Sequence, residues 1–146
     1  MADAGLYVLG RSLEILVVDD SPDDAKMILW TLDKGRKRKS VVTLMDGAQA
    51  MTYLRTREDG LKPDLILLDL NMPVKDGWEV LAECKGDPLL KAIPIVVFST
   101  SSRPMDVKRG YAMGANSFVT KPFDLADFKA AVEMIEDYWL GLSVSA

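Results

Sequence analysis

The chain has 146 residues, 49% of them hydrophobic and 27% charged, so it can bury one substantial core and has the size of a single domain. Its net charge of -4 argues against a nucleic-acid partner, because phosphate repels an acidic surface. A lone cysteine excludes an intrachain disulfide, and no apolar stretch is long enough to span a membrane, so we expect a cytoplasmic protein without a membrane partner.

Five short apolar runs have the character of β-strands. They are residues 15–18, 41–45, 65–68, 95–98 and 117–119. The runs are largely aliphatic and lack a regular polar face, which is typical of strands buried on both sides in a parallel sheet. We therefore expect a sheet that is covered by helices on both faces.

Helical patterns alternate with these runs. The first helix is expected to start at Ser21 and Pro22, which suit an N-cap and a first turn. Asp23 and Asp24 fall in this first turn, where carboxylates favour the helix dipole, so we interpret them as capping acids and not as metal ligands. A basic run at 34–39 follows the helix and is expected to be a solvated loop.

The remaining helices give the fold class. They are expected to begin at Asp46, Asp76, Pro104 and Asp124. Each strand is then followed by a helix, which predicts the α/β class and a (βα)5 doubly wound fold. We expect a five-stranded parallel sheet in the flavodoxin-like order 2-1-3-4-5.

The last helix carries more apolar surface than one face of a sheet requires. Its expected core stripe is Leu125, Phe128, Val132, Ile135 and Trp139. Charged residues expected on the solvent side are Lys129, Glu133, Glu136 and Asp137. Surplus apolar surface marks an interaction site, so we expect a homodimer or partner surface comprising Met134, Tyr138, Trp139 and Leu142. The alternative is an aromatic end that folds back over its own sheet.

Acids, hydroxyls and a lysine follow the predicted strands at their carboxyl ends. In chain order they are Asp19, Asp20, Asp69, Ser99, Thr100 and Lys121. Ligands of doubly wound sheets bind at this edge. Clustered carboxylates repel one another unless a cation neutralises them, and oxygen ligands suit Mg²⁺. A carboxylate could then attack a phosphoryl group whose charge the cation and lysine neutralise, and Asp69, the central acid, is the best candidate nucleophile.

Four segments of the sequence contain the strand-end residues, and they are ILVVDD (15–20), LILLDLNMPVKDG (65–77), IVVFSTS (95–101) and FVTKP (118–122). In this order and spacing they resemble the receiver domains of response regulators in two-component signalling. Two further segments, 81–101 and 135–140, are similar to the single-domain regulators paired with bacterial and cyanobacterial phytochromes. We accordingly divide the chain into an N-terminal extension (1–13), a receiver domain (14–140) and a C-terminal tail (141–146).

The resemblance implies a role for each strand-end residue. Asp69 is the expected phosphoacceptor, and the expected Mg²⁺ ligands are Asp20, Asp69, the backbone carbonyl of Asn71 and, through water, Asp19. The expected phosphoryl-binding and switch residues are Ser99, Thr100, Lys121 and Phe118. A cis peptide bond between Lys121 and Pro122 is also implied. The chain contains no histidine, so a separate sensor histidine kinase must supply the phosphoryl group, and the narrower resemblance points to a phytochrome.

Three other functions fit the residues less well. A phosphatase of the haloacid-dehalogenase type also uses a strand-end aspartate, but it needs a second aspartate where this chain has Asn71. A flavin-binding module would place phosphate beside Asp19 and Asp20, which repel it. A degenerate receiver that serves only as an interaction module would not need an intact set of acids and lysine. We therefore expect a single-domain response regulator that catalyses only its own phosphorylation and dephosphorylation and signals by a conformational switch.

Overall fold

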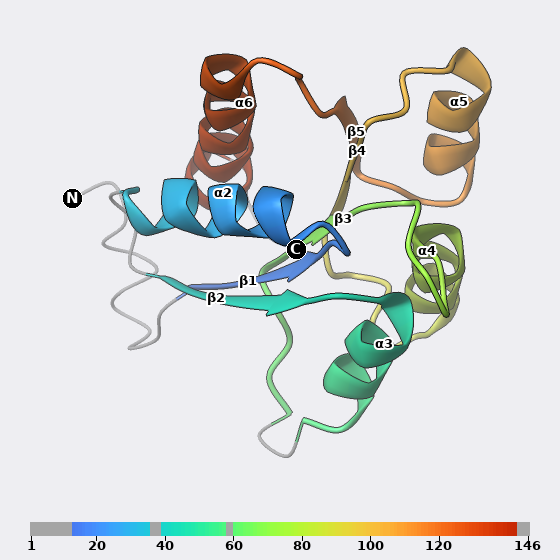
Figure 1. Ribbon diagram of the computed structural model, residues 1–146. Helices are drawn as coiled ribbons and strands as arrows, with labels where there is room; N and C mark the ends of the chain where they lie inside the picture. Colours follow the sequence, from blue (N-terminus) through green and yellow to red (C-terminus); the bar gives the residue numbers. More distant parts are fainter. Residues whose placement is uncertain (1–12, 36–38, 58–59, 143–146) are drawn as a thin grey trace.

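The computed structural model describes residues 13–35, 39–57 and 60–142 (Figure 1). In chain order the elements are β1 (Leu13–Val18), α2 (Pro22–Asp33), β2 (Lys39–Leu44), α3 (Gly47–Arg55), β3 (Leu65–Leu68), α4 (Gly77–Gly86), β4 (Ile95–Ser99), α5 (Pro104–Ala112), β5 (Ser117–Thr120), α6 (Leu125–Asp137) and the π-helix η1 (Tyr138–Leu142). The N-terminal extension lies outside the described residues up to position 12, and so do the last four residues of the tail. None of the helices described here has the length and apolarity to cross a membrane.

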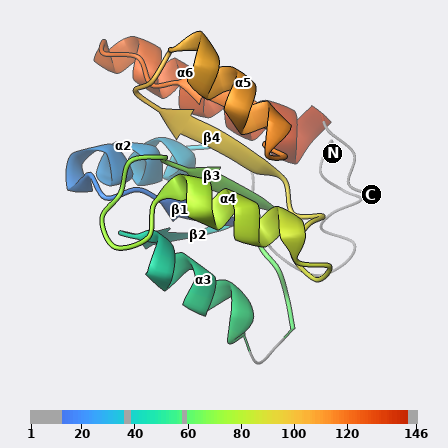
Figure 2. The same cartoon turned by 90° about the vertical axis from the view of Figure 1, so that its right-hand side faces the viewer.

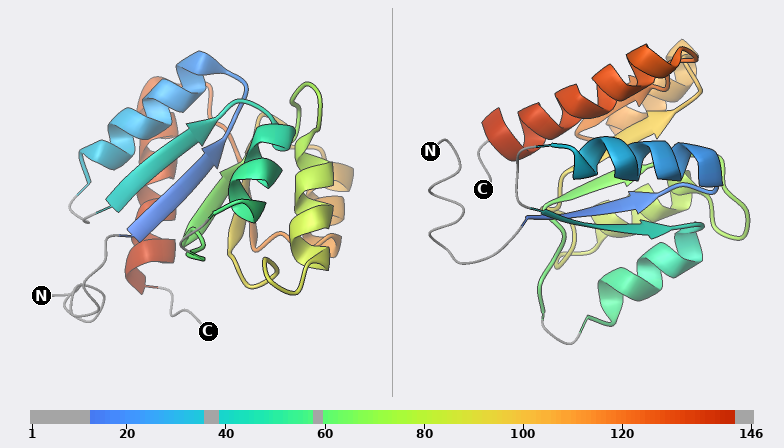
Figure 3. Two further views of the ribbon diagram at one scale, coloured as in Figure 1. Left: turned by 90° about the horizontal axis from the view of Figure 1, so that it is seen from below. Right: turned by 60° about the vertical axis from the view of Figure 1, so that its left-hand side comes forward.

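The five strands form one sheet in the order β2-β1-β3-β4-β5, and every neighbouring pair is parallel. The arrows of β1 and β2 accordingly point the same way in Figure 3. Helices α2 and α6 cover one face of the sheet, and α3, α4 and α5 lie on the other (Figures 1 and 2). The predicted fold and strand order are confirmed.

Two hydrophobic cores fill the space between the sheet and its helices. Alternate side chains of a strand point to opposite faces, so β1 contributes to both. Ile15 and Val17 pack with α2 and α6, whereas Leu16 and Val18 pack with α3 and α4. All four side chains are buried, and this explains why the strand has no polar face in the sequence. Cys84 is also buried, on the α4 side.

The predicted helix starts are confirmed, and four of the five carry a side-chain cap, whereas α5 begins at Pro104 without one. The Ser21 hydroxyl accepts a hydrogen bond from the Asp24 amide at the start of α2. Carboxylates cap α3, α4 and α6 in the same way, and they belong to Asp46, Asp76 and Asp124. These contacts satisfy backbone N–H groups that have no partner inside a helix. They also fix where each loop at the carboxyl edge of the sheet ends.

Three expectations about charged and apolar positions are wrong. Lys39 is not in a solvated loop but begins β2, and its Nζ lies 2.6 Å from a carboxylate oxygen of Glu136. Both side chains are buried, and the ammonium group also donates to the carbonyl of Leu32 at 2.6 Å. Glu136 therefore faces inward, because a cation from another element neutralises it. Leu125, expected in the core, is 54% exposed because it is the first residue of α6.

Candidate functional site

The polar strand-end residues meet at the carboxyl edge of the sheet. Pairing of β1 with β3 sets Asp69 next to Asp19, since the Asp69 amide donates to the carbonyl of Val18 at 2.9 Å. Pairing of β4 with β5 sets Lys121 next to Ser99, whose carbonyl accepts from the Lys121 amide at 2.7 Å. The parallel register thus brings together residues that are up to 102 positions apart in the chain.

Three carboxylates form a compact cluster at this edge. One oxygen each from Asp19, Asp20 and Asp69 lies within 4.8 Å of the other two. Asp19 and Asp69 are only 2% and 8% exposed. Burial, opposed by Lys121 and reinforced by Asp19, raises the pKa of Asp69 from 3.8 to about 6. Burial also raises the pKa of Asp19, although Lys121 opposes the effect. An all-oxygen cluster with this unfavourable charge fits a hard divalent cation, which would neutralise it.

Lys121 is the cation that faces these acids. Its Nζ lies 2.7 Å from Asp19, 2.9 Å from Asp24 and 3.6 Å from Asp69. Burial alone would lower the pKa of Lys121, but the hydrogen bonds to Asp19 and Asp24 outweigh it, and the pKa is raised. The ammonium group therefore remains charged at neutral pH and partly compensates the carboxylates.

Asp24 also belongs to this site, although its contact with Lys121 was not predicted from the sequence. Its position in the first turn of α2 indicated a capping acid, and its amide does take part in the N-terminal cap. Its carboxylate, however, turns to Lys121. The sequence did place Asp24 close to the acids that follow β1. A position in a helix, however, does not tell where the side chain points.

The expected switch residues belong to β4 and β5 or follow β4 directly, and they differ in burial. Ser99 is fully buried, and its hydroxyl accepts from the Ser101 amide at 3.3 Å. Thr100 is exposed at the rim. Phe118 is half-buried, and its ring packs so closely on Gly110 of α5 that a β-carbon there would come within 2.9 Å of it. The site is therefore linked to α5 through a tight aromatic contact.

The peptide bond between Lys121 and Pro122 is trans, since there is no cis bond among the residues that the structure describes. The expectation of a cis bond is therefore wrong. Trans is the lower-energy isomer of an X–Pro bond, and this geometry still brings the Lys121 ammonium group into the site.

The loop after Asp69 is held close to the site by backbone contacts. The Gly77 amide donates to the carbonyl of Leu70 at 2.9 Å. A β-carbon at Gly77 would lie 2.1 Å from the carbonyl oxygen of Asp69, so only glycine permits this approach. Asn71 lies within this loop with an exposed side chain. The two ends of the segment that contains Asn71 are thereby held together at the end of β3.

The tip of the same loop is a tight turn in which one residue has an unfavourable backbone conformation. The Lys75 amide donates to the carbonyl of Pro73 at 2.8 Å, which makes a γ-turn centred on Val74. Val74 has φ of 67°, a region that β-branched residues avoid. Such a conformation costs on the order of 1–3 kcal/mol and persists only where neighbouring contacts impose it.

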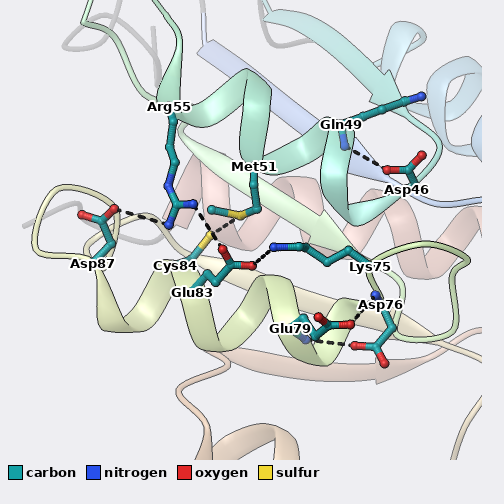
Figure 4. A network of polar contacts seen from close by, with 10 residues as sticks. All are labelled: Asp46, Gln49, Met51, Arg55, Lys75, Asp76, Glu79, Glu83, Cys84 and Asp87. Atoms are coloured by element: carbon teal, nitrogen blue, oxygen red, sulfur yellow. Dashed lines mark hydrogen bonds and ion pairs between the residues drawn. The ribbon is translucent and has the colours of Figure 1, made fainter.

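Contacts with α3 and α4 impose that turn (Figure 4). Lys75 forms an ion pair with Glu83 of α4, and Glu83 also accepts from Arg55 of α3 at 3.2 Å. The carbonyl of Lys75 accepts from the Gly47 amide at 3.0 Å. The hydrogen bond from Lys75 is the main cause of a lowered pKa at Glu83. The network fastens the loop that carries Asn71 to two helices.

The free energy of unfolding should depend on whether the Asp69 carboxylate is charged. A raised pKa in the folded state means that protonated Asp69 favours folding, and this contribution is lost as the pH rises through about 6. In metal-free buffer at pH 7.5, Asp69→Asn should therefore raise the free energy of unfolding by on the order of 2–3 kcal/mol, because the amide is neutral.

Thermal melting between pH 4 and pH 8 measures this effect. The gain of Asp69→Asn should shrink toward zero near pH 4, where the native carboxyl is protonated. Asp137→Asn, an exposed change on α6, is the control and should alter the melting temperature little at any pH. A gain for Asp69→Asn that is equal at pH 4 and pH 7.5 would contradict the assignment of strain to this carboxylate.

Comparison with known proteins gives consistent matches. The family described as the response regulator receiver domain matches residues 15–133. The response regulator Rcp1 of Synechocystis sp. is 42% identical over 129 residues, which cover 86% of this chain and 88% of Rcp1. The crystal structure of the phosphorylated cyanobacterial phytochrome response regulator RcpA is similar, with a TM-score of 0.88 and 41% identity, over 92% of this chain and 99% of RcpA. The crystal structure of the Mn²⁺-bound form of Rcp1 has a TM-score of 0.86 at 39% identity, with the same coverage.

Proposed function

The chain belongs to the response regulator receiver domain family, and we propose that it is a switch that accepts a phosphoryl group on Asp69 from a sensor histidine kinase. The observation that carries this proposal is the position of Asp69. Its carboxylate lies between two other acids and a buried lysine, at the end of a strand in the middle of the sheet. Such an arrangement suits attack on phosphorus by one carboxylate oxygen.

The chain's own residues supply most of the chemistry. An oxygen of Asp69 forms a bond to phosphorus while the bond between phosphorus and the donor breaks. Lys121, already 3.6 Å from Asp69, neutralises part of the charge on the phosphoryl oxygens. The parent chain incubated with acetyl phosphate and Mg²⁺ should gain one phosphoryl group, which intact mass measurement detects. No gain under these conditions would contradict the proposal.

We propose Mg²⁺ as the cation of the site. The residues that would hold it are Asp20, Asp69, the backbone carbonyl of Asn71 and, through water, Asp19. When bound, the cation neutralises the carboxylates and the phosphoryl oxygens. The Mn²⁺-bound structure of Rcp1 supports a divalent metal in a close relative, and Mg²⁺ is the choice that suits an all-oxygen ligand set.

The proposed switch acts through Ser99 and Phe118. A phosphoryl group on Asp69 would accept hydrogen bonds from the hydroxyl of Ser99 and from Lys121, with Thr100 at the rim. These new bonds supply the difference in affinity that a conformational change requires. Movement of Ser99 would free space for Phe118, whose contact with Gly110 transmits the change to α5. The proposed output surface is formed by α5, β5 and α6.

We propose a separate protein as the donor of the phosphoryl group, because the chain contains no histidine that could carry it. A sensor histidine kinase is the donor expected for the family, and a phytochrome is the form of kinase that we propose. The description of RcpA as a phytochrome response regulator supports this choice. We also propose that the protein is cytoplasmic. Its receiver domain would comprise residues 14–140, with an N-terminal extension (1–13) and a C-terminal tail (141–146).

The end of α6 provides the proposed surface for a homodimer. An apolar groove of about 380 Å³ runs between β5 and α6, and it is lined by Ser117, Val119, Ala131, Met134, Ile135, Tyr138 and Trp139. Met134 is 70% exposed, whereas Trp139 packs partly on the core shared by α2 and α6. The aromatic end therefore folds back in part and leaves Met134 and Tyr138 available. The side chain of Leu142 lies outside the described part of the structure.

Sedimentation tests this surface. The parent should be a dimer at micromolar concentration, and Met134→Arg combined with Tyr138→Arg should shift it to monomer, because a buried unpaired charge opposes association. Leu89→Arg, an exposed apolar residue after α4, is the matched control and should leave the dimer intact. A parent that stays monomeric with and without beryllofluoride would rule out the homodimer.

A further inference from the structure

We infer that Asp24 is a positioning residue that holds the ammonium group of Lys121 away from the phosphoryl-binding position and thereby weakens the site's affinity for a phosphoryl group. The inference rests on the proposed roles of Asp69 and Lys121. The carboxylate of Asp24 is not part of the cluster that would bind a metal, and it does not cap α2.

The contacts of Lys121 show how its ammonium group is shared. The carboxylates of Asp19 and Asp24 accept hydrogen bonds from Nζ at 2.7 and 2.9 Å. Asp69 lies farther away, at 3.6 Å, which is an ion-pair distance beyond a good hydrogen bond. An ammonium group has three donors, and two of them are therefore directed at acids other than the proposed phosphoacceptor.

Asp24 is distinct from the acids that would hold a metal. The cluster of carboxylate oxygens within 4.8 Å of one another comprises Asp19, Asp20 and Asp69. Asp24 reaches the site from the first turn of α2, and its side chain is 32% exposed, whereas that of Asp19 is almost fully buried. Its carboxylate accepts a hydrogen bond from the ammonium group of Lys121. It is therefore the more readily exchanged of the two hydrogen-bonded partners of the lysine.

Two physical effects follow when an anion arrives on Asp69. The phosphoryl oxygens need a donor from Lys121, and Asp24 competes for that donor. The negative charge of Asp24 also repels the incoming anion at short range. Both effects act in the same direction, so neutralising Asp24 should strengthen binding of a phosphoryl group. Mg²⁺ binding should not be strengthened, because removing a negative charge never favours a cation.

Asp23 offers a matched control for Asp24. Both acids lie in the first turn of α2, so replacing either by asparagine removes the same charge from the same end of the helix. Asp23 is exposed, and the acids that contact Lys121 are Asp19, Asp24 and Asp69. A difference between the two variants therefore isolates the contact with the lysine.

The experiment titrates beryllofluoride into the parent, Asp24→Asn and Asp23→Asn at saturating Mg²⁺, with tryptophan fluorescence or calorimetry as the readout. Asp24→Asn should bind about fivefold more tightly than the parent, the scale of a partly exposed charge pair worth about 1 kcal/mol. Asp23→Asn should stay within about twofold of the parent, since its charge lies outside the site. Asp24→Ser, which shortens the side chain, should reproduce the gain and provides a second variant. Mg²⁺ titration without beryllofluoride should show no gain for any variant.

Two results overturn the inference and are distinguishable. If the parent binds beryllofluoride with Mg²⁺ but Asp24→Asn binds equally or more weakly, Asp24 does not restrain Lys121, and the proposed function stands. If the parent does not bind beryllofluoride in Mg²⁺ at all, the proposed function fails together with the inference.

Discussion

Replacing Asp69 with asparagine should abolish stable phosphorylation by acetyl phosphate in the presence of Mg²⁺. The amide has nearly the same size as the carboxylate and can remain beside Lys121, but it has no anionic oxygen to attack phosphorus. Intact mass measurement should show one added phosphoryl group on the parent and none on Asp69→Asn. The expected effect is a loss of the whole adduct and not a slower reaction.

The control for this experiment is Asp137→Asn, which removes an exposed carboxylate at the end of α6 and should be phosphorylated like the parent. Thermal melting of Asp69→Asn checks that the variant is folded, and the raised pKa of Asp69 leads us to expect a melting temperature no lower than that of the parent. An equal adduct on the parent and on Asp69→Asn would place the acceptor at another residue.

Removing Mg²⁺ should nearly eliminate binding of beryllofluoride, which stands in for the phosphoryl group. Without the cation, an anion must enter a site where three clustered carboxylates and Asp24 face one ammonium group. Repulsion of this kind costs several kcal/mol in a water-poor site, so we expect affinity to fall by about a hundredfold or more. Fluorescence titration with Mg²⁺ and with a chelator measures the change.

Asp20→Asn provides the companion variant, because Asp20 is the half-buried member of the carboxylate cluster and a proposed direct ligand. It should need a higher Mg²⁺ concentration before beryllofluoride binds, while the fold remains intact. Asp23→Asn serves as the charge-matched control in the adjoining turn. Tight beryllofluoride binding by the parent in chelated buffer would contradict a metal-dependent site.

The fold and the main site residues were predictable because strand ends in a parallel sheet converge by geometry. Once five strands alternate with helices, the acids after β1 and β3, the hydroxyl ending β4 and the lysine after β5 must lie on one edge. Helix caps such as Asp76 were equally predictable, because a cap depends on residues only three positions apart in the sequence.

Contacts between side chains of distant elements were not predictable in the same way. Asp24 was interpreted as a capping acid because its helical position says nothing of the lysine that lies 97 residues away. The same reason explains Glu136, which a helical wheel puts in solvent but which pairs with Lys39 across the fold. Val74 has a positive φ that the Lys75 and Glu83 contacts impose against its own preference.

The most direct test of the central claim is to locate the phosphoryl group chemically. Reduction of an aspartyl phosphate with borohydride converts that aspartate to homoserine, which peptide sequencing by mass spectrometry identifies. After incubation with acetyl phosphate and Mg²⁺, the parent should carry homoserine at position 69, in the peptide that follows β3, and should carry none when a chelator is present. Homoserine at another aspartate, or at none despite a phosphorylated intact mass, would contradict the assignment of Asp69 as the acceptor.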